Sequence, residues 1–223
     1  MRKYPLVSGH LYHVLTRSIA KYKVFNSSED YDRIIEALRL YQYNNFDLKI
    51  SDYKKYSDKQ QKVIYNSLRS DNRKSTDIIA YCIMPTHIHL ILRQIEDLGI
   101  SWYVSKLLNS YTRHFNCIHK RKGPLWEGRF KNILINSDEQ LLHLTRYLHL
   151  NPSSAGLVKK PEQWNYSSLR EYISRKKNAD NITVYHDLID MSPKDYRIFI
   201  KENITYQRKL SIIKHLTLDD YSG

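Results

Sequence analysis

The 223-residue sequence is poor in cysteine and glycine, and it lacks any long apolar run. Its two cysteines, Cys82 and Cys117, match neither the spacing of a zinc knuckle nor a disulfide framework, which indicates a reducing compartment. Six glycines leave no glycine-rich loop for nucleotide phosphates, which disfavours a small-molecule enzyme of that kind. No stretch reaches the ~20 apolar residues of a membrane span, and residues 1–14 lack the apolar centre of a signal peptide. We therefore expect a cytoplasmic protein with no membrane partner.

Acidic residues are also scarce relative to basic ones. Lys and Arg number 36 against 23 Asp and Glu, which gives a formal net charge of +13. An excess of this size favours a polyanionic partner, most simply a nucleic acid. The alternative is a soluble basic protein without such a partner. Tyrosine is abundant, at 19 residues, so any single tyrosine is more often structural than catalytic.

Apolar periodicity predicts strands and helices in alternation over the first two thirds of the chain. The expected strands are 10–18, 77–84, 87–93 and 126–136, and the expected helices are 29–43, 101–119 and 137–150. Pro85 is expected at a bulge, sheet edge or strand end, because proline cannot donate to a ladder. Asn151-Pro152 is expected to end the last of these helices. This order predicts an α+β sandwich with a mainly antiparallel sheet and helices on one face.

Two segments fall outside this alternation. Residues 44–76 are polar and charged, with a weak helical pattern at 58–68, and we expect them to form an excursion between the first helix and the next strand. Residues 174–223 are expected to form a small helical accessory tail, in which Ser192-Pro193 starts a helix. The main domain would then comprise residues 1–173.

His87 and His89 are the first candidates for chemistry. They lie two apart on a predicted strand, so both imidazoles project from one face. Ile88 and Leu90 would then point the other way, into the core. Two imidazoles on one face can ligate a divalent metal. With ten histidines in the chain, roughly 0.45 such pairs arise by chance, so a purely structural interpretation stays open.

The helix predicted over 101–119 carries Tyr111 on its apolar stripe, where a tyrosine usually belongs to the core with its hydroxyl hydrogen-bonded at the rim. A basic segment with interleaved aromatics follows. It is either a solvated loop or a surface where cations meet phosphates and aromatic faces stack on unpaired bases; we favour the second. The residues expected to contact DNA are Arg17, Arg113, Lys120, Arg121, Lys122, Trp126, Arg129 and Lys131.

Five sequence blocks, in order, surround these candidates. They are AYCIMPTHIHLILRQ (80–94), GISWYVSKLLNSYTRHFN (99–116), GPLWEGRFKNILI (123–135), LLHLTRYLHLNPSSAGLV (141–158) and WNYSSLREY (164–172), preceded by YHVLTRSIAKYKVF (12–25). Over about residues 8–173 the chain resembles the single-tyrosine HUH transposases, in the branch that includes the repeat-associated tyrosine transposases. It departs from the family at Thr86, where Asn is frequent; this change should not alter ligation.

The resemblance implies a ferredoxin-like core in which His87 and His89 ligate Mg²⁺ or Mn²⁺ and Tyr111 is the nucleophile. It implies cleavage and rejoining of single-stranded DNA with a hairpin, through a 5′-phosphotyrosine intermediate. The third metal ligand would come from the tyrosine's own helix, with Asn116 favoured and His114 as its rival. A homodimer is expected, because in relatives the tyrosine helix can complete the partner's site.

Other functions remain open at this point. A basic module of the same fold, or a domesticated derivative, could bind nucleic acid without cutting it. A metal-dependent nuclease could use water in place of Tyr111. Formation of a covalent adduct with an oligonucleotide separates the first from an enzyme, and a Tyr→Phe substitution that still cuts would indicate the second.

Overall fold

The computed structural model describes residues 5–174 and 181–202. Four strands form one antiparallel sheet in the order β2-β3-β1-β4. They are β1 (Leu11–Arg17), β2 (Thr76–Met84), β3 (His87–Gln94) and β4 (Lys131–Ile135). Two crossovers join parallel, non-adjacent strands: α1 (Ser28–Tyr41) connects β1 to β2, and α4 (Gly99–Ile118) connects β3 to β4. This is the ferredoxin-like arrangement, so the predicted α+β class and core are confirmed.

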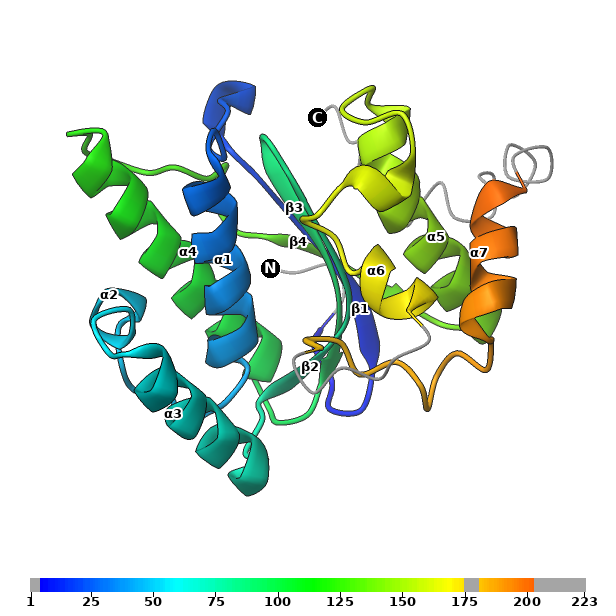
Figure 1. The fold of residues 1–223 in the computed structure, drawn as a ribbon, viewed down its shortest axis with the longest axis horizontal. Helices are drawn as coiled ribbons and strands as arrows, with labels where there is room; N and C mark the ends of the chain where they lie inside the picture. Colours follow the sequence, from blue (N-terminus) through cyan, green and yellow to red (C-terminus); the bar gives the residue numbers. More distant parts are fainter. Residues whose placement is uncertain (1–4, 175–180, 203–223) are drawn as a thin grey trace.

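One face of the sheet is covered by α1 and α4, with the short α2 (Ile50–Tyr53) and α3 (Asp58–Asp71) beside them (Figure 1). This layer encloses one apolar core, to which β3 contributes Ile88 and Leu90. The 44–76 excursion is a folded part of the layer, because Tyr53 and Leu68 are buried in the same core. The weak helical pattern at 58–68 is confirmed as α3, which a Ser57 capping box starts.

The opposite face is covered by α5 (Asp138–Ser154), α6 (Leu169–Ile173) and α7 (Pro193–Lys201) (Figure 1). A second apolar core lies there, with Ile91 of β3 packed against Leu144 and Leu148 of α5. The expectation that helices cover one face is therefore wrong for this half of the fold. The cause is β2, which is buried at every position; a strand that is apolar on both faces needs a covering layer on each.

The described part of the predicted accessory tail belongs to this second layer. Tyr196 and Ile200 of α7 are buried in the same core as α5 and α6. Ser192 caps α7 and Pro193 follows it, as the sequence indicated. Residues 175–180 and 203–223 of the expected tail lie outside the described residues.

Three boundaries differ from or refine the predictions. Pro85 and Thr86 form the tight turn between β2 and β3, so β2 ends at Met84, directly before Pro85, which confirms the expected strand end. The strand expected over 126–136 is shorter, because β4 starts at Lys131. Helix α5 continues through Asn151 and Pro152 to Ser154, since a proline in the last turn removes only one helical hydrogen bond.

The described residues also contain two single turns of 3-10 helix, η1 (Ile19–Lys21) and η2 (Pro161–Gln163). No helix in the described parts of the chain is long and apolar enough to cross a bilayer.

Candidate active site between strand β3 and helix α5

The two histidines of β3 project toward α5 and away from α4. Ile88 and Leu90 lie in the core under α1 and α4, whereas Ile91 lies in the core under α5. Because side chains alternate along a strand, His87 and His89 share the α5 face. Their ring centroids are 4.9 Å apart. The predicted placement of both imidazoles on one face of a strand is confirmed.

Helix α5 brings two further polar side chains to this pair. The Nδ2 atom of Asn151 lies 3.1 Å from Nε2 of His89. The ring of Tyr147 lies edge-on to the ring of His89, with centroids 5.9 Å apart, and Tyr147 is partly exposed. The two residues are four apart on a helix and therefore share a face. A histidine pair, an amide and a partly exposed tyrosine thus meet at one place.

The imidazole of His89 is fully buried and engaged at both nitrogens. Its Nδ1 lies 3.0 Å from Nε2 of His13 on β1, and its Nε2 faces Asn151. Burial, reinforced by the nearby charges of His87 and His13, holds the pKa of His89 well below its ordinary value. The ring is therefore neutral at physiological pH, which is the state a metal ligand requires.

The imidazole of His87 has one nitrogen occupied and one without a hydrogen-bond partner. Its Nδ1 lies 2.9 Å from Oγ1 of Thr86, and its Nε2 is buried without a hydrogen-bond partner. Burial and the charge of Arg17 lower the pKa of His87 to about 4. An unsatisfied buried nitrogen costs about 1–3 kcal/mol unless something else binds it, and a divalent metal would do so.

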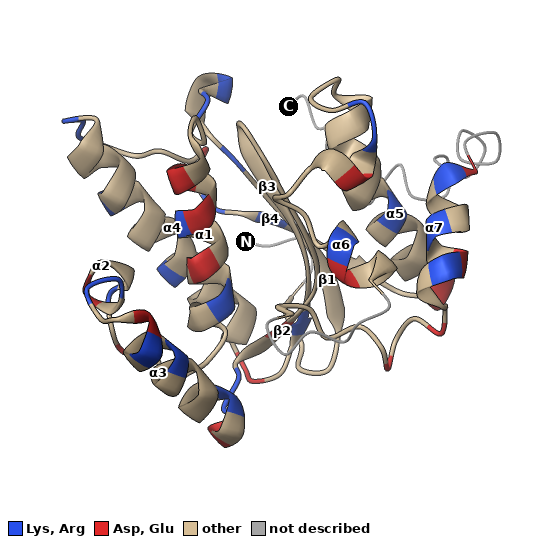
Figure 2. Ribbon diagram, in the orientation of Figure 1, with Lys and Arg blue, Asp and Glu red and all other residues tan. Residues whose placement is uncertain are grey.

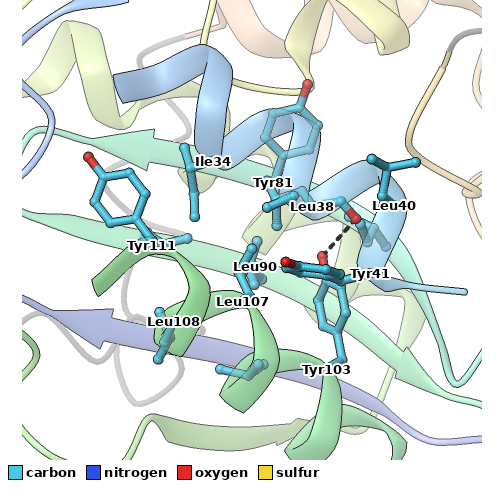
Figure 3. Close-up of a cluster of buried hydrophobic side chains, with 14 of the residues drawn as sticks. Ile34, Leu38, Leu40, Tyr41, Tyr81, Leu90, Tyr103, Leu107, Leu108 and Tyr111 are labelled. Carbon is cyan, nitrogen blue, oxygen red and sulfur yellow. Dashed lines mark hydrogen bonds between the residues drawn. The ribbon is translucent and has the colours of Figure 1, made fainter. Parts of the chain in front are cut away.

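Tyr111 does not join this group. It is 1% exposed on α4, on the other face of the sheet, where Figure 3 shows it among the side chains of the first core. Its hydroxyl donates a 2.6 Å hydrogen bond to the carbonyl of Val24, and its ring lies 4.7 Å from that of Phe25. Burial raises its pKa. The geometry corrects the assignment of Tyr111 as nucleophile: a β-sheet separates it from the histidine pair.

Neither predicted third ligand lies at the histidine pair. Asn116 lies in the last turn of α4 and fixes the following loop, because its Nδ2 donates to the carbonyl of Gly123 at 2.9 Å and its Oδ1 accepts from Arg121 at 3.1 Å. His114 lies beside Tyr111, with ring centroids 6.1 Å apart. Both corrections have the same cause as the one for Tyr111, since α4 covers the far face.

Three of the residues expected to contact DNA lie beside the histidine pair. Arg17 is directly opposite His87 in the β1–β3 register. Lys131 is opposite Leu15, the residue of β1 that also faces His89 across the sheet. Arg17, Arg129 and Lys131 line a small pocket at this end of the sheet. Residues directly opposite one another share a face, so these cations flank the candidate site.

The other expected DNA contacts lie around the end of α4. Arg113, Lys120 and Lys122 are exposed there. Trp126 is 7% exposed and its indole nitrogen donates to Oγ1 of Thr112 at 3.0 Å, so it is a core residue, which contradicts its predicted stacking role. Arg121 is held by Asn116 and by the carbonyl of Pro124 at 2.8 Å. Figure 2 shows that basic residues occur on both helical layers.

Sequence reasoning missed Tyr147 and Asn151. Both lie in the block LLHLTRYLHLNPSSAGLV, four residues apart on a predicted helix. That spacing was a usable signal. The expectation that Asn151-Pro152 ends the helix hides it, because Asn151 is then no longer on a helical face with Tyr147.

The donors present suit Mg²⁺ or Mn²⁺ only in part. Nitrogen from two neutral imidazoles and oxygen from an amide is a set that such ions accept, with substrate oxygens completing the shell. Within residues 5–174 and 181–202, no group of three or more His, Cys, Asp or Glu side chains is placed to hold a metal ion. The amide of Asn151 lies beside the pair, with its Nδ2 atom toward Nε2 of His89.

Comparison with known proteins finds a family likeness over the middle of the chain. Residues 53–151 match the family model described as "Transposase IS200 like"; this segment contains the histidine pair and Tyr147 and ends at Asn151. The chain is also 30% identical over 102 residues to a protein of Haemophilus influenzae, named provisionally as a REP-associated tyrosine transposase. The sequence resemblance is thereby confirmed for this segment.

These likenesses are limited in extent. The sequence match covers 41% of this chain and 58% of the Haemophilus protein. In fold, the chain resembles a solved structure described as a REP-associated tyrosine transposase bound to a REP hairpin, with a TM-score of 0.52 over 86% of this chain and 94% of that one. At 16% identity this likeness shows the fold alone.

Proposed function

We propose that this chain, which is similar over residues 53–151 to the IS200-like transposases, cuts and rejoins single-stranded DNA with Tyr147 as nucleophile. The observation that supports this most directly is the position of Tyr147. It is a partly exposed phenol beside His89, on the helix that also presents Asn151 to that histidine. A nucleophilic tyrosine needs access to a phosphorus atom, which the buried Tyr111 lacks.

In this proposal His87, His89 and Asn151 hold the metal ion. Nε2 of His87 is available because Nδ1 is occupied by Thr86. The Asn151 amide reaches Nε2 of His89, and a rotation of that amide would present its oxygen instead. Bound there, Mg²⁺ or Mn²⁺ would withdraw electron density from the scissile phosphate and stabilise the departing 3′ oxygen.

The residues of this chain carry out the remaining steps. Arg17, Arg129 and Lys131 neutralise backbone phosphates and set the strand across the site. The Tyr147 oxygen attacks phosphorus in line, its proton passes to solvent, and the P–O bond to the 3′ oxygen breaks. The product is a 5′-phosphotyrosyl ester and a free 3′-hydroxyl. Attack on this ester by a 3′-hydroxyl rejoins strands and releases the phenol without ATP.

The substrate proposed is single-stranded DNA that carries a hairpin. The solved structure of similar fold is described as bound to a REP hairpin, and the net charge of +13 suits a polyanion. Within one chain, Tyr147 already lies at its own His89. The expected homodimer therefore need not supply the tyrosine, although two copies can still assemble on DNA.

The test is formation of a covalent adduct. Wild type is incubated with Mn²⁺ and 5′- or 3′-labelled hairpin oligonucleotides, and the products are separated on a denaturing protein gel. We expect a shifted protein band with wild type and with Tyr111→Phe, and none with Tyr147→Phe. Cutting by Tyr147→Phe without an adduct would indicate a water-using nuclease, and absence of cutting by wild type on any hairpin would favour a binding module.

A further inference from the structure

The strand next to β3 places a third histidine against the candidate metal site. His13 of β1 lies opposite Ile91 in the register, so it shares the α5 face with His89, which is two residues along β3. Its side chain is 0% exposed, as is that of His89. The two rings are nearly parallel, at 14°, and the atoms Nε2 of His13 and Nδ1 of His89 are 3.0 Å apart.

With the Asn151 amide oriented as it is in the structure, its contact with His89 assigns the proton of that ring. The Nδ2 atom of Asn151 faces Nε2 of His89, and an amide nitrogen can only donate. Nε2 of His89 therefore accepts. A neutral imidazole has one N–H, so Nδ1 carries the proton and donates to Nε2 of His13.

We propose that His13 is the positioning residue of His89: it accepts the Nδ1–H of His89 and so keeps the Nε2 lone pair directed at the metal site. This inference rests on the proposed function, in which His89 is a ligand. A ligating histidine usually donates its other N–H to a carboxylate, carbonyl or water. Here a ring nitrogen of a second buried imidazole, Nε2 of His13, takes that place.

Because it is buried, the hydrogen bond between His13 and His89 controls the tautomer of His89. Because both side chains are fully buried, water has no ready route to replace His13 as acceptor. Without His13, His89 can instead move its proton to Nε2, which would block the nitrogen that ligates. His13 belongs to the block 12–25, which precedes the segment matched by the family model from residue 53 onward, and the pairing of β1 with β3 brings it to the site.

The first test reads the tautomer in metal-free protein. Long-range ¹H–¹⁵N spectra of the histidine side chains, with His89 assigned through His89→Gln, should show the Nδ1–H tautomer in wild type. His13→Gln keeps an acceptor at the same reach and should preserve it. His13→Leu should shift His89 toward the Nε2–H tautomer. An Nε2–H form in wild type, or an unchanged Nδ1–H form in His13→Leu, would overturn the inference.

The second test measures Mn²⁺ affinity by electron paramagnetic resonance, together with the melting temperature. His13→Leu should bind Mn²⁺ roughly 10–100-fold more weakly, while His13→Gln stays within about threefold of wild type. His143→Leu replaces another buried histidine, which lies against Phe199 of α7, and should bind as wild type does. Wild-type affinity in a folded His13→Leu would refute the role of His13. Failure of wild type to bind Mn²⁺ would instead refute the proposed metal site, and the tautomer result would still decide on His13.

Discussion

The two faces of the sheet each carry a tyrosine on a covering helix, but in opposite environments. Tyr111 on α4 is enclosed by aromatic and aliphatic side chains, and its hydroxyl is committed to the carbonyl of Val24. Tyr147 on α5 is partly exposed and borders His89. The first face is an apolar core around Tyr111, while the second brings His13, His87 and His89 together with the Asn151 amide and flanking cations. A tyrosine on the helix that follows a His-x-His strand therefore indicates a nucleophile only if that helix covers the face of the sheet onto which the histidines project.

The largest expected difference between the faces is in covalent chemistry. Tyr147→Phe should reduce adduct formation by roughly 10⁴-fold or more, because the nucleophilic oxygen is removed. Tyr111→Phe, which removes only a buried hydrogen bond worth about 0.5–1.5 kcal/mol, should keep adduct formation near wild type. Quantified gel shifts with a labelled oligonucleotide measure both. A reversal of the two results would restore Tyr111 as the nucleophile.

The two tyrosines should rank in the opposite order by the effect of their substitution on the free energy of unfolding. Tyr111→Ala removes a ring that is 1% exposed and should lower the free energy of unfolding by about 3–5 kcal/mol. Tyr147→Ala, at a partly exposed position, should cost about 1 kcal/mol, a typical value for a single substitution. Urea unfolding followed by circular dichroism gives both values. Equal losses would mean that the two tyrosines are buried alike.

Metal affinity should distinguish the two asparagines. Asn151→Ala should weaken Mn²⁺ binding about tenfold or more, because a ligand is lost beside His89. Asn116 lies in the last turn of α4, where its side chain holds the following loop through Gly123 and Arg121. Asn116→Ala should therefore leave Mn²⁺ affinity unchanged. Calorimetric titration of the folded variants provides the comparison. Weaker binding in Asn116→Ala alone would place the ligand on α4.

Low pH should destabilise the protein mainly through buried histidines on the α5 face of the sheet. His149 of α5 is buried, bonded to the hydroxyls of Tyr196 and Ser168 at 2.8 Å each, and burial lowers its pKa to about 3. In the unfolded chain its pKa is near the ordinary 6.5. The stabilisation is therefore complete above about pH 6.5 and is lost as the pH falls toward 3, because only the unfolded chain takes up the proton.

His149→Gln should accordingly be less stable than wild type at pH 7.5, with a shallower fall in melting temperature between pH 6.5 and 4. Thermal unfolding across this range measures the two slopes. An unchanged slope would show that the folded chain protonates His149 as readily as the unfolded chain does.

The smallest expected effect is the absence of complementation when two inactive variants of the chain are mixed. Because Tyr147 lies at His89 of the same chain, mixing His89→Ala with Tyr147→Phe should restore no adduct formation beyond that of either variant alone. Substantial recovery on mixing would show that the tyrosine acts in a partner's site.

Much of this arrangement was predictable. Alternation along β3 correctly placed the two histidines on one face, and the order of elements gave the ferredoxin-like core. The assignment of Tyr111 failed because it assumed that the helix after β3 covers the face onto which the histidines project. In the β3-α4-β4 crossover, α4 lies on the same face as α1, onto which Ile88 points. Helix α5 therefore covers the opposite face of the sheet, onto which His89 projects.

Other features depend on distant contacts that no local pattern contains. His13 meets His89 through the pairing of β1 with β3, 76 residues apart in sequence. The burial of Trp126 results from packing under α4, with its indole N–H satisfied by Thr112. Helix α5 extends through Pro152 because a single lost hydrogen bond in its last turn is tolerable. Only the tertiary structure decides these positions.

The most direct measurement locates the DNA on the protein. The covalent adduct formed by wild type is digested with nuclease and trypsin, and the peptide that retains a nucleotide is identified by mass spectrometry. Tyr147 lies in the tryptic peptide 147–159 and Tyr111 in the peptide 107–113. We predict the nucleotide on peptide 147–159, linked through the phenol oxygen of Tyr147. A nucleotide on peptide 107–113 would contradict this prediction.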